Sequence, residues 1–264
     1  MKIALCVKQV PDTSDIKWTE NNTMQRDGVE SIINPYDVYA LEQALKLKKE
    51  LNAEITVFTM GPLQAADMLR DTIAVGADKG ILISDKKFAG ADTYATGKTI
   101  SAAIKKELPD FDLILCGQFA IDGDTAQTGP CIASLLDIPQ LTYVREINDC
   151  NDNILTATRV LDDGIETVKV QLPALLCILK SDFEPQRALI NGIIKAQNAE
   201  IKTVSLDNLG LNPEDAGIKG SPTYVSKAFR PEVKHGGEKF FCLENREGAE
   251  ILYGKIKEIG VLNG

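Results

Sequence analysis

The first half of the chain alternates short apolar runs with longer segments of helical periodicity, and this alternation limits the possible folds more than any other feature. Apolar runs that predict buried strands occupy residues 3–7, 55–60, 80–84 and 113–116. Segments that predict helices follow them at residues 35–51, 62–75, 93–108 and 125–137. Strands joined by helical crossovers lie parallel, so the sequence predicts an α/β fold with an open, mostly parallel sheet and helices on both faces.

The second half departs from this pattern. Strand-like runs occupy residues 141–144, 154–161, 165–172 and 175–179, and the middle two are joined by the hairpin signal Asp163-Gly164. A polar insertion at 12–31 predicts another, smaller hairpin. From Ser181 onward, prolines punctuate a chain with few core-forming runs, before a predicted helix at 247–259. We therefore expect an α/β domain over residues 1–180 and an extended arm over 181–264 that folds against a partner.

Charge and hydropathy exclude several classes of protein. The net charge is −9, and Lys and Arg form no continuous run, which argues against nucleic-acid binding. The apolar stretch at the N-terminus is too short for a signal peptide, and no later run has the length needed to cross a bilayer. We expect a soluble, cytoplasmic protein without membrane insertion.

Cysteine and histidine usage limits the chemistry available to the side chains. The six cysteines include no C-x-x-C pair, and strand-like runs hold Cys6, Cys116 and Cys177, which predicts buried free thiols. His235 is the single histidine, so neither a His-based triad nor a His-rich metal site can form. We expect no metal, and any redox reaction would need a cofactor.

The junction after the fourth predicted strand is the strongest candidate for a ligand site. Residues 117–128 link a buried strand to a helix, where backbone N–H groups and the positive helix end bind anions such as a nucleotide phosphate. Asp124 and Gln127 have the spacing of a capping box for the helix at 125–137. Gly123 would then allow close approach of the backbone to the ligand. A capped turn without a ligand explains the same residues equally well.

Other segments lie at the same edge of the predicted sheet. Lys8 follows the first strand, residues 59–61 end the second, and residues 34–37 open the first helix. A helix cap followed by proline at the first helical position is a sufficient structural reason for the motif at 34–37. Because the carboxyl ends of parallel strands meet at one edge, these segments and residues 117–128 predict a single crevice.

Familiar nucleotide-binding motifs are absent from the sequence. No G-x-G-x-x-G follows the first strand, which excludes a Rossmann fingerprint there. Gly90 and Gly97 are separated by six residues where a P-loop has four, which excludes a nucleoside triphosphatase of that kind. Thr93 and Thr96, just after Asp92, carry hydroxyls that can face a phosphate. A capped helix start with surface threonines is the favoured interpretation of these residues.

Short motifs in the same order along the chain resemble the beta, or small, subunit of electron transfer flavoproteins. They are residues 6–12, 34–37, 59–62, 76–78, 92–96 and 122–127. The stretch from Ala157 to Cys177 also resembles that subunit's signature, through Arg159, Asp162-Asp163-Gly164, Glu166, Val168, Pro173 and Leu175-Leu176. Gly123 and the segment 92–96 resemble the electron-bifurcating type, although Gly97 stands where that branch commonly has a serine.

This resemblance implies an adenine-nucleotide-hydrolase-like α/β fold with an arm that embraces the alpha subunit. Bifurcating members hold an FAD that takes a hydride from NADH. One electron goes to ferredoxin or flavodoxin and the other, through the alpha-subunit FAD, toward an acyl-CoA dehydrogenase- or enoyl-CoA reductase-type flavoenzyme. Oxidoreductase activity would then belong to the complex, in anaerobic metabolism. Ordinary members hold a structural AMP instead, and their subunit is a scaffold and docking surface.

The resemblance and the converging segments together give the expected cofactor-binding residues, which are Cys6, Lys8, Asn34, Pro35, Tyr36, Asp37, Met60, Thr93, Thr96, Gly117, Gln118, Phe119, Ala120, Ile121, Asp122, Gly123, Asp124, Thr125, Ala126, Gln127 and Thr128. The resemblance also implies that residues 184–196 form a loop that docks the partner flavoenzyme through Leu189 and Ile190. The alternative is that these two side chains pack against the alpha subunit. No catalytic acid or base is expected, because hydride transfer to flavin needs none.

Overall fold

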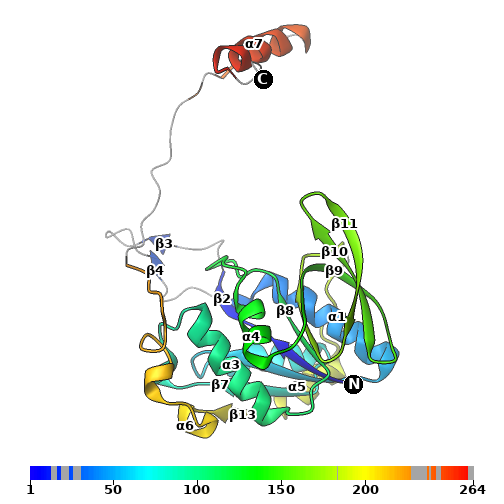
Figure 1. The fold of residues 1–264 in the computed structure, drawn as a ribbon, viewed down its shortest axis with the longest axis vertical. Coiled ribbons are helices and arrows are strands. Elements are labelled where there is room, and N and C mark those ends of the chain that lie inside the picture. Colours follow the sequence, from blue (N-terminus) through cyan, green and yellow to red (C-terminus); the bar gives the residue numbers. More distant parts are fainter. Residues whose placement is uncertain are drawn as a thin grey trace. The chain divides into compact units, whose positions relative to one another are not determined.

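One sheet, in the strand order β11-β10-β9-β12-β8-β1-β6-β7-β13, forms the centre of the fold (Figure 1). The computed structural model describes residues 1–12, 17–18, 24–25, 31–182, 184–226, 237, 239–241 and 245–260. The strands of this sheet are β1 (Lys2–Cys6), β6 (Glu54–Met60), β7 (Lys79–Ile83), β8 (Leu113–Gly117), β9 (Gln140–Asn151), β10 (Ile154–Leu161), β11 (Gly164–Gln171), β12 (Ala174–Ile178) and β13 (Ile201–Val204).

Within the stretch β9-β12-β8-β1-β6-β7-β13 of this order, neighbouring strands pair in parallel. β10, in contrast, pairs antiparallel with both β9 and β11. The predicted β10–β11 hairpin is confirmed, and its turn lies at Asp162-Asp163, one residue before the Asp163-Gly164 signal. The predicted open, mostly parallel α/β fold is confirmed.

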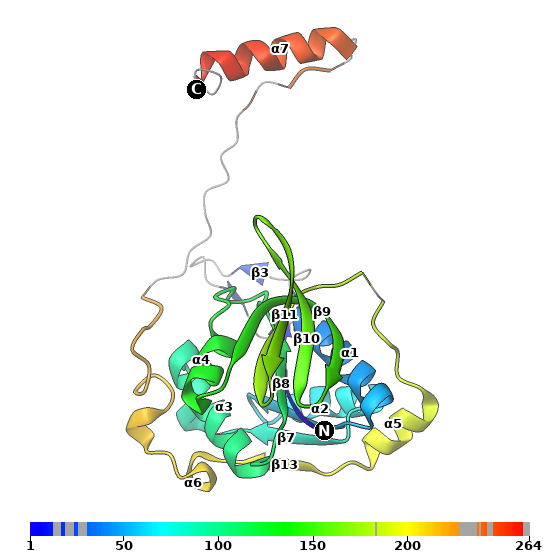
Figure 2. The ribbon, with the colours of Figure 1, turned by 45° about the vertical axis from the view of Figure 1, so that its right-hand side comes forward.

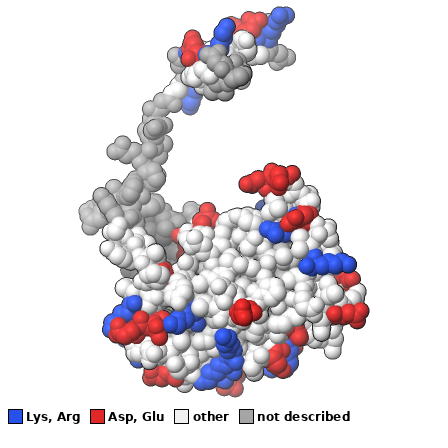
Figure 3. Space-filling model, in the orientation of Figure 1, with Lys and Arg blue, Asp and Glu red and all other residues white. Residues whose placement is uncertain are grey.

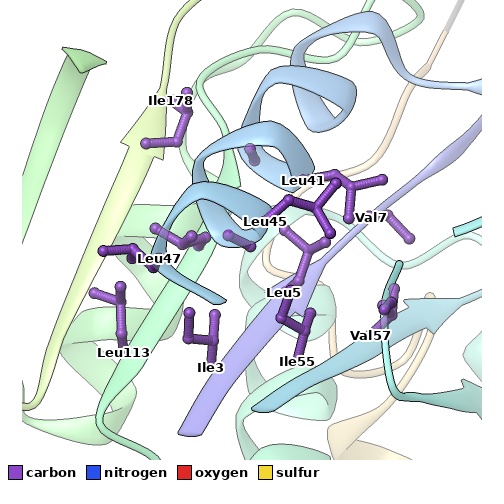
Figure 4. Close-up of a cluster of buried hydrophobic side chains, with 14 of the residues drawn as sticks. Ile3, Leu5, Val7, Leu41, Leu45, Leu47, Ile55, Val57, Leu113 and Ile178 are labelled. Carbon is purple, nitrogen blue, oxygen red and sulfur yellow. The ribbon is translucent and has the colours of Figure 1, made fainter. Parts of the chain in front are cut away.

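Helices cover both faces of the sheet (Figure 2). The first face carries α1 (Pro35–Leu51), α2 (Ala65–Val75) and α5 (Ile190–Gln197), and the second carries α3 (Thr93–Glu107) and α4 (Thr128–Leu136). Successive strand residues point to opposite faces, so Ile3 and Leu5 pack beneath α1, while Ala4 and Cys6 belong to a separate cluster under α3 and α4. Figure 4 shows the α1 leucines over the strands of the first face. No helix in the described part of the chain is long and apolar enough to cross a membrane.

The remaining elements are short. β2 (Gln9–Pro11) pairs with β5 (Ser31–Ile33), and β3 (Lys17–Trp18) pairs with β4 (Met24–Gln25). The second pair is a small antiparallel ladder inside the insertion where the sequence predicts a hairpin. Other short elements are α6 (Leu206–Leu209) and the 3₁₀ turns Lys86–Phe88 and Pro213–Asp215.

The chain divides into two compact units, Met1–Ala228 and Phe229–Gly264. The first unit continues past residue 180, where the sequence places a boundary, because β13 pairs with β7 and extends the sheet. Sequence patterns miss α5, β13 and α6, which are too short for periodicity to show. The second unit contains α7 (Asn245–Glu258), which overlaps the predicted helix at 247–259 and exposes Leu252 and Tyr253.

The strand order reverses beside β1. The chain runs from β1 through α1 to β6 and through α2 to β7 on one side, and then crosses by α3 to β8 on the other side of β1. Open α/β sheets bind ligands at such a switch point, outside the carboxyl ends of the strands. The carboxyl ends of β1 and β8 lead directly into Lys8 and residues 117–128, so the topology brings the predicted segments to this edge.

Candidate functional site

The Asp37 carboxylate, in the first turn of α1, joins the ends of β1 and β8. It accepts hydrogen bonds from the backbone N–H of Lys8, at 2.7 Å, and of Gly117, at 2.9 Å. A Cβ atom at position 117 would lie 2.4 Å from Asp37 Oδ1, so this close approach requires glycine. The start of α1 is thereby fixed against both strands of the switch point.

Asn34 stands at the N-cap position of α1, but its side chain makes no capping hydrogen bond. Its Nδ2 donates instead to the Phe119 carbonyl at 2.8 Å, and its Oδ1 accepts from the Ile121 N–H at 3.3 Å. Asn34 is 1% exposed, so the amide is buried with its polar atoms directed at the loop. The predicted N-cap position of Asn34 before Pro35 is confirmed, but the expectation that its side chain caps the helix is wrong. Asn34 shapes residues 117–128 instead, because it bonds to the loop backbone.

The predicted capping box at the end of this loop is also wrong. α4 begins at Thr128, with Gln127 at the N-cap position and no side-chain cap. Asp124, at φ 50°, and Ala126, at φ 56°, adopt left-handed conformations, which stop the helix from beginning at Thr125. The positive end of α4 therefore has no side-chain cap and points its first N–H groups out of the helix, as an anion site requires.

The loop between these points carries a partly offset negative charge and open space. Lys8 Nζ lies 2.5 Å from Asp122 Oδ1, which offsets one of the two loop carboxylates. A Cβ atom built at Gly123 would meet no atom within 4 Å. The space beside the Gly123 backbone is therefore open.

The start of α3 is closed by its own cap. Asp92 Oδ1 accepts from the N–H groups of Tyr94 and Ala95, each at 3.0 Å, which confirms the interpretation of Asp92 as an N-cap. The Thr96 N–H donates to the Asp92 carbonyl. Thr93 Oγ1 lies 3.4 Å from Gln127 Oε1, so α3 brings a hydroxyl, rather than its first amides, to the end of the loop.

Cys6 and Met60 lie at the same edge but are largely covered. Cys6 is aligned with Cys116 on β8, which is aligned with Cys177 on β12, and the Sγ atoms of Cys116 and Cys177 are 3.6 Å apart. Burial raises the pKa of the Cys6 thiol, and the contact with Cys177 together with burial raises the pKa of Cys116. The predicted buried free thiols are confirmed for these three residues. Met60, at the end of β6, packs against the same cluster.

Asp37 is an unusual acid in this setting. Burial raises its pKa from 3.8 to about 7, although hydrogen bonds from the Lys8 amide, Asn34 and the Gly117 amide, and then the Lys8 charge, act in the opposite direction. The group that joins β1 to β8 therefore titrates near neutral pH.

Sequence reasoning missed Tyr143 of β9. Its backbone N–H donates to Oε1 of the buried Gln118 at 2.6 Å, and its φ of 58° is left-handed. Phe119 contacts two aromatic rings edge to face, with centroids 5.4 Å from Tyr36 and 6.0 Å from Tyr143. A lone tyrosine in a strand gives no local signal of such a contact. The site thus extends from α1 across the loop to β9.

The molecular surface carries charges of both signs. On the face shown in Figure 3, Lys and Arg are interspersed with Asp and Glu. Within the described residues, no cluster of His, Cys, Asp and Glu has a geometry that could hold a metal ion. His235 and Cys242 lie outside these residues.

Comparison with known proteins gives consistent matches. A profile of the electron transfer flavoprotein domain matches residues 21–209. The caffeyl-CoA reductase-Etf complex subunit CarD of Acetobacterium woodii is 45% identical over 260 residues, covering 98% of each chain. The electron transfer flavoprotein subunit beta of Thermoanaerobacterium thermosaccharolyticum is 44% identical over 242 residues, covering 91% of this chain and 92% of that protein.

A further relative is the acryloyl-CoA reductase electron transfer subunit gamma of Anaerotignum propionicum, which is 45% identical over 269 residues and covers 99% of this chain and 100% of that protein. The domain match spans more than half of the chain, and the relatives align over nearly all of it. The chain therefore belongs to the electron transfer flavoprotein family and is a relative of its beta subunits.

Proposed function

We propose that this chain is the beta subunit of a heterodimeric electron transfer flavoprotein of the bifurcating type, with FAD bound at the β1–β8 switch point. The observation that carries the proposal is the uncapped start of α4 beside Gly123, in a loop held by Asn34 and Asp37. When bound, FAD supplies hydride acceptance from NADH and divides the electrons between ferredoxin or flavodoxin and the alpha-subunit FAD.

The residues present fit an adenine nucleotide. The first N–H groups of α4 and the hydroxyls of Thr125 and Thr128 are donors for a diphosphate. The adenosine would lie at the carboxyl ends of β1 and β6, against Cys6, residues 34–37 and Met60. In this arrangement the chain binds and orients the cofactor, and the edge-to-face aromatic contacts of Phe119 stiffen the loop.

The names of two relatives support an acyl-CoA dehydrogenase- or enoyl-CoA reductase-type flavoenzyme as the partner, since they are called subunits of caffeyl-CoA and acryloyl-CoA reductase systems. Leu189 and Ile190, at the start of α5, are 78% and 77% exposed. Adjacent exposed aliphatic side chains are suited to anchor a protein interface, so we assign docking of the flavoenzyme to this pair. The alpha subunit would bind elsewhere, through the part of the arm that follows Ala228 and contains α7.

One observation favours a second candidate, a non-bifurcating subunit with structural AMP. Asp92 occupies the first amides of α3, so the helix start that carries Thr93 and Thr96 is closed to a diphosphate. A single phosphate needs only the start of α4. In this case the chain would act as a scaffold and docking surface.

The test is to count nucleotides in the heterodimer. The chain is co-expressed with its alpha subunit, the purified complex is extracted with acid, and FAD and AMP are quantified by chromatography. We expect two FAD per heterodimer. One FAD with one AMP would disprove the bifurcating assignment and leave the scaffold function.

A glycine substitution tests the location of the site. Gly123→Ala adds a methyl group where no atom lies within 4 Å, so stability should be unchanged while the nucleotide content of this subunit falls. Lys49→Ala is the control, because it changes an exposed side chain in the last turn of α1, at the other end of the helix from the crevice. Full nucleotide content in Gly123→Ala would show that the ligand does not approach the backbone there.

A further inference from the structure

Glu42 is a buried carboxylate on α1, two turns from the start of the helix. It is 6% exposed, and both of its oxygens accept hydrogen bonds from one distant residue. Glu42 Oε1 accepts from the backbone N–H of Gln186 at 2.6 Å, and Oε2 accepts from Gln186 Nε2 at 3.0 Å. Hydrogen bonds to a carboxylate are stronger than neutral ones, so this contact fastens the chain at residue 186 to α1.

The segment fastened in this way has no regular structure of its own. Residues 184–189 form neither helix nor strand and lead into α5. α5 is fixed on α2, since a Cβ atom at Gly192 would lie 2.0 Å from the Ala74 carbonyl oxygen. Lys195 Nζ also donates to the Ala77 carbonyl at 3.0 Å. The segment is thus held at one end by Glu42 and at the other by the contact between α5 and α2.

Leu189 and Ile190 lie between these two attachments. Their side chains stay exposed, although the chain on both sides is hydrogen-bonded or closely packed. A segment without regular structure would lose conformational entropy on binding, and holding it in advance reduces that cost. Fixing the backbone beside two exposed aliphatic side chains is how a binding loop is preorganised.

We propose that Glu42 is a positioning residue, which holds residues 184–189 in place so that Leu189 and Ile190 are presented to the partner flavoenzyme. The inference rests on the proposed docking role of that pair. In this arrangement α1 serves two sites. Asp37, in its first turn, bonds to the backbone at the proposed cofactor crevice, and Glu42, further along, holds the docking segment. One rigid helix therefore sets the position of the docking segment relative to the crevice.

Arg187 provides a direct readout, because it is exposed and lies between the attachment at Gln186 and the docking pair. The intact heterodimer is treated with trypsin, and cleavage after Arg187 is timed by mass spectrometry, together with amide hydrogen exchange of residues 184–189. In Glu42→Leu, trypsin should cleave after Arg187 about tenfold faster than in the wild type. The reason is that the segment can open locally without breaking charge-assisted hydrogen bonds to residue 42. Exchange in the segment should rise in parallel.

Conservative and matched variants separate positioning from general stability. Glu42→Gln keeps an oxygen that can accept the Gln186 N–H, so its cleavage rate should stay within about twofold of the wild type. Glu50→Leu, at an exposed position on the same helix, should leave cleavage after Arg187 unchanged. Gln186→Ala keeps Glu42 and removes one donor from an exposed side chain, so it should give an intermediate rate even if Glu42→Leu folds poorly.

Wild-type cleavage and exchange in both Glu42→Leu and Gln186→Ala would overturn the proposal. If the proposed docking role of Leu189 and Ile190 is wrong, a different result is expected. In that case Glu42→Leu would still loosen the segment, but Ile190→Asp would leave electron transfer to the flavoenzyme of the native complex unchanged.

Discussion

At the scale of single residues, the site depends on buried polar side chains whose partners lie far away in the sequence. Asp37 bonds to residues 29 and 80 positions away, and Asn34 bonds to residues 85 and 87 positions away. Such groups are costly to bury unless they are hydrogen-bonded, so each ties the loop to α1. The same burial gives Asp37 its raised pKa.

Asp37 should make stability depend on pH. Its folded-state pKa of about 7 is above the ordinary value of 3.8. The contribution of Asp37 to the free energy of unfolding is therefore fully present below pH 3.8 and is lost as the pH rises toward 7. We expect the free energy of unfolding of the wild type, relative to Asp37→Asn, to fall by about 2 kcal/mol between pH 5.5 and pH 8. Urea denaturation followed by circular dichroism measures this difference.

Asp162→Asn, in the exposed turn between β10 and β11, is the control for that experiment and should follow the wild type at every pH. Taking differences between proteins removes the contributions of other titrating groups. A constant difference between wild type and Asp37→Asn across the range would contradict the raised pKa.

At the scale of elements, the contact between α3 and α4 determines what position 97 can hold. A Cβ atom at Gly97 would lie 2.9 Å from the Sγ and 3.2 Å from the Cβ of Cys131 in α4. Position 97 therefore belongs to the packing between two helices. This contact explains, for this chain, the glycine that stands where the bifurcating branch commonly has a serine.

Gly97→Ser should destabilise the protein by about 1–3 kcal/mol, because the added side chain overpacks the contact between α3 and α4. Cys131→Ala removes the nearest atom, so in the double variant it should restore at least half of the loss. A double-mutant cycle measured by urea denaturation gives the coupling. Additive effects of the two substitutions would show that position 97 does not press on Cys131.

At the scale of the whole molecule, the two compact units differ in how they are built. Among the described residues, both hydrophobic clusters of the first unit end by Ala216, within Met1–Ala228. In the described part of the second unit, α7 exposes Leu252 and Tyr253 at 61% and 60%. Apolar side chains exposed on a helix are suited to bind another protein, in agreement with the proposed arm.

A chain ending at Ala228 should therefore fold but fail to assemble. We expect its free energy of unfolding to lie within about 0.5 kcal/mol of the full chain, because no member of either core cluster is removed. Co-purification with the alpha subunit should be lost, because the part of the arm proposed to bind that subunit is missing. Denaturation curves and size-exclusion chromatography of the co-expressed subunits measure the two effects. Loss of cooperative unfolding, or retained assembly, would contradict this division of roles.

The sequence alone determined the arrangement of strands and helices in the first half of the chain. Periodicity and helix-start residues act over a few neighbours, so they predicted α1 at residues 35–51 and α3 starting at residue 93 as the structure has them. They also indicated the edge of the sheet at which the candidate site lies, since parallel strands carry their carboxyl ends to the same side.

Tertiary structure decided everything that depends on distant partners. The side chain of Asn34 bonds to the loop rather than to α1, α4 starts at Thr128 rather than Thr125, and Glu42 meets Gln186 across 144 positions. β13 joins the sheet because β7 offers an edge for pairing. A run of four residues does not by itself predict that pairing. Local patterns record the conformation of a segment, whereas the partner of a buried polar group is known only once the sheet has brought the segments together.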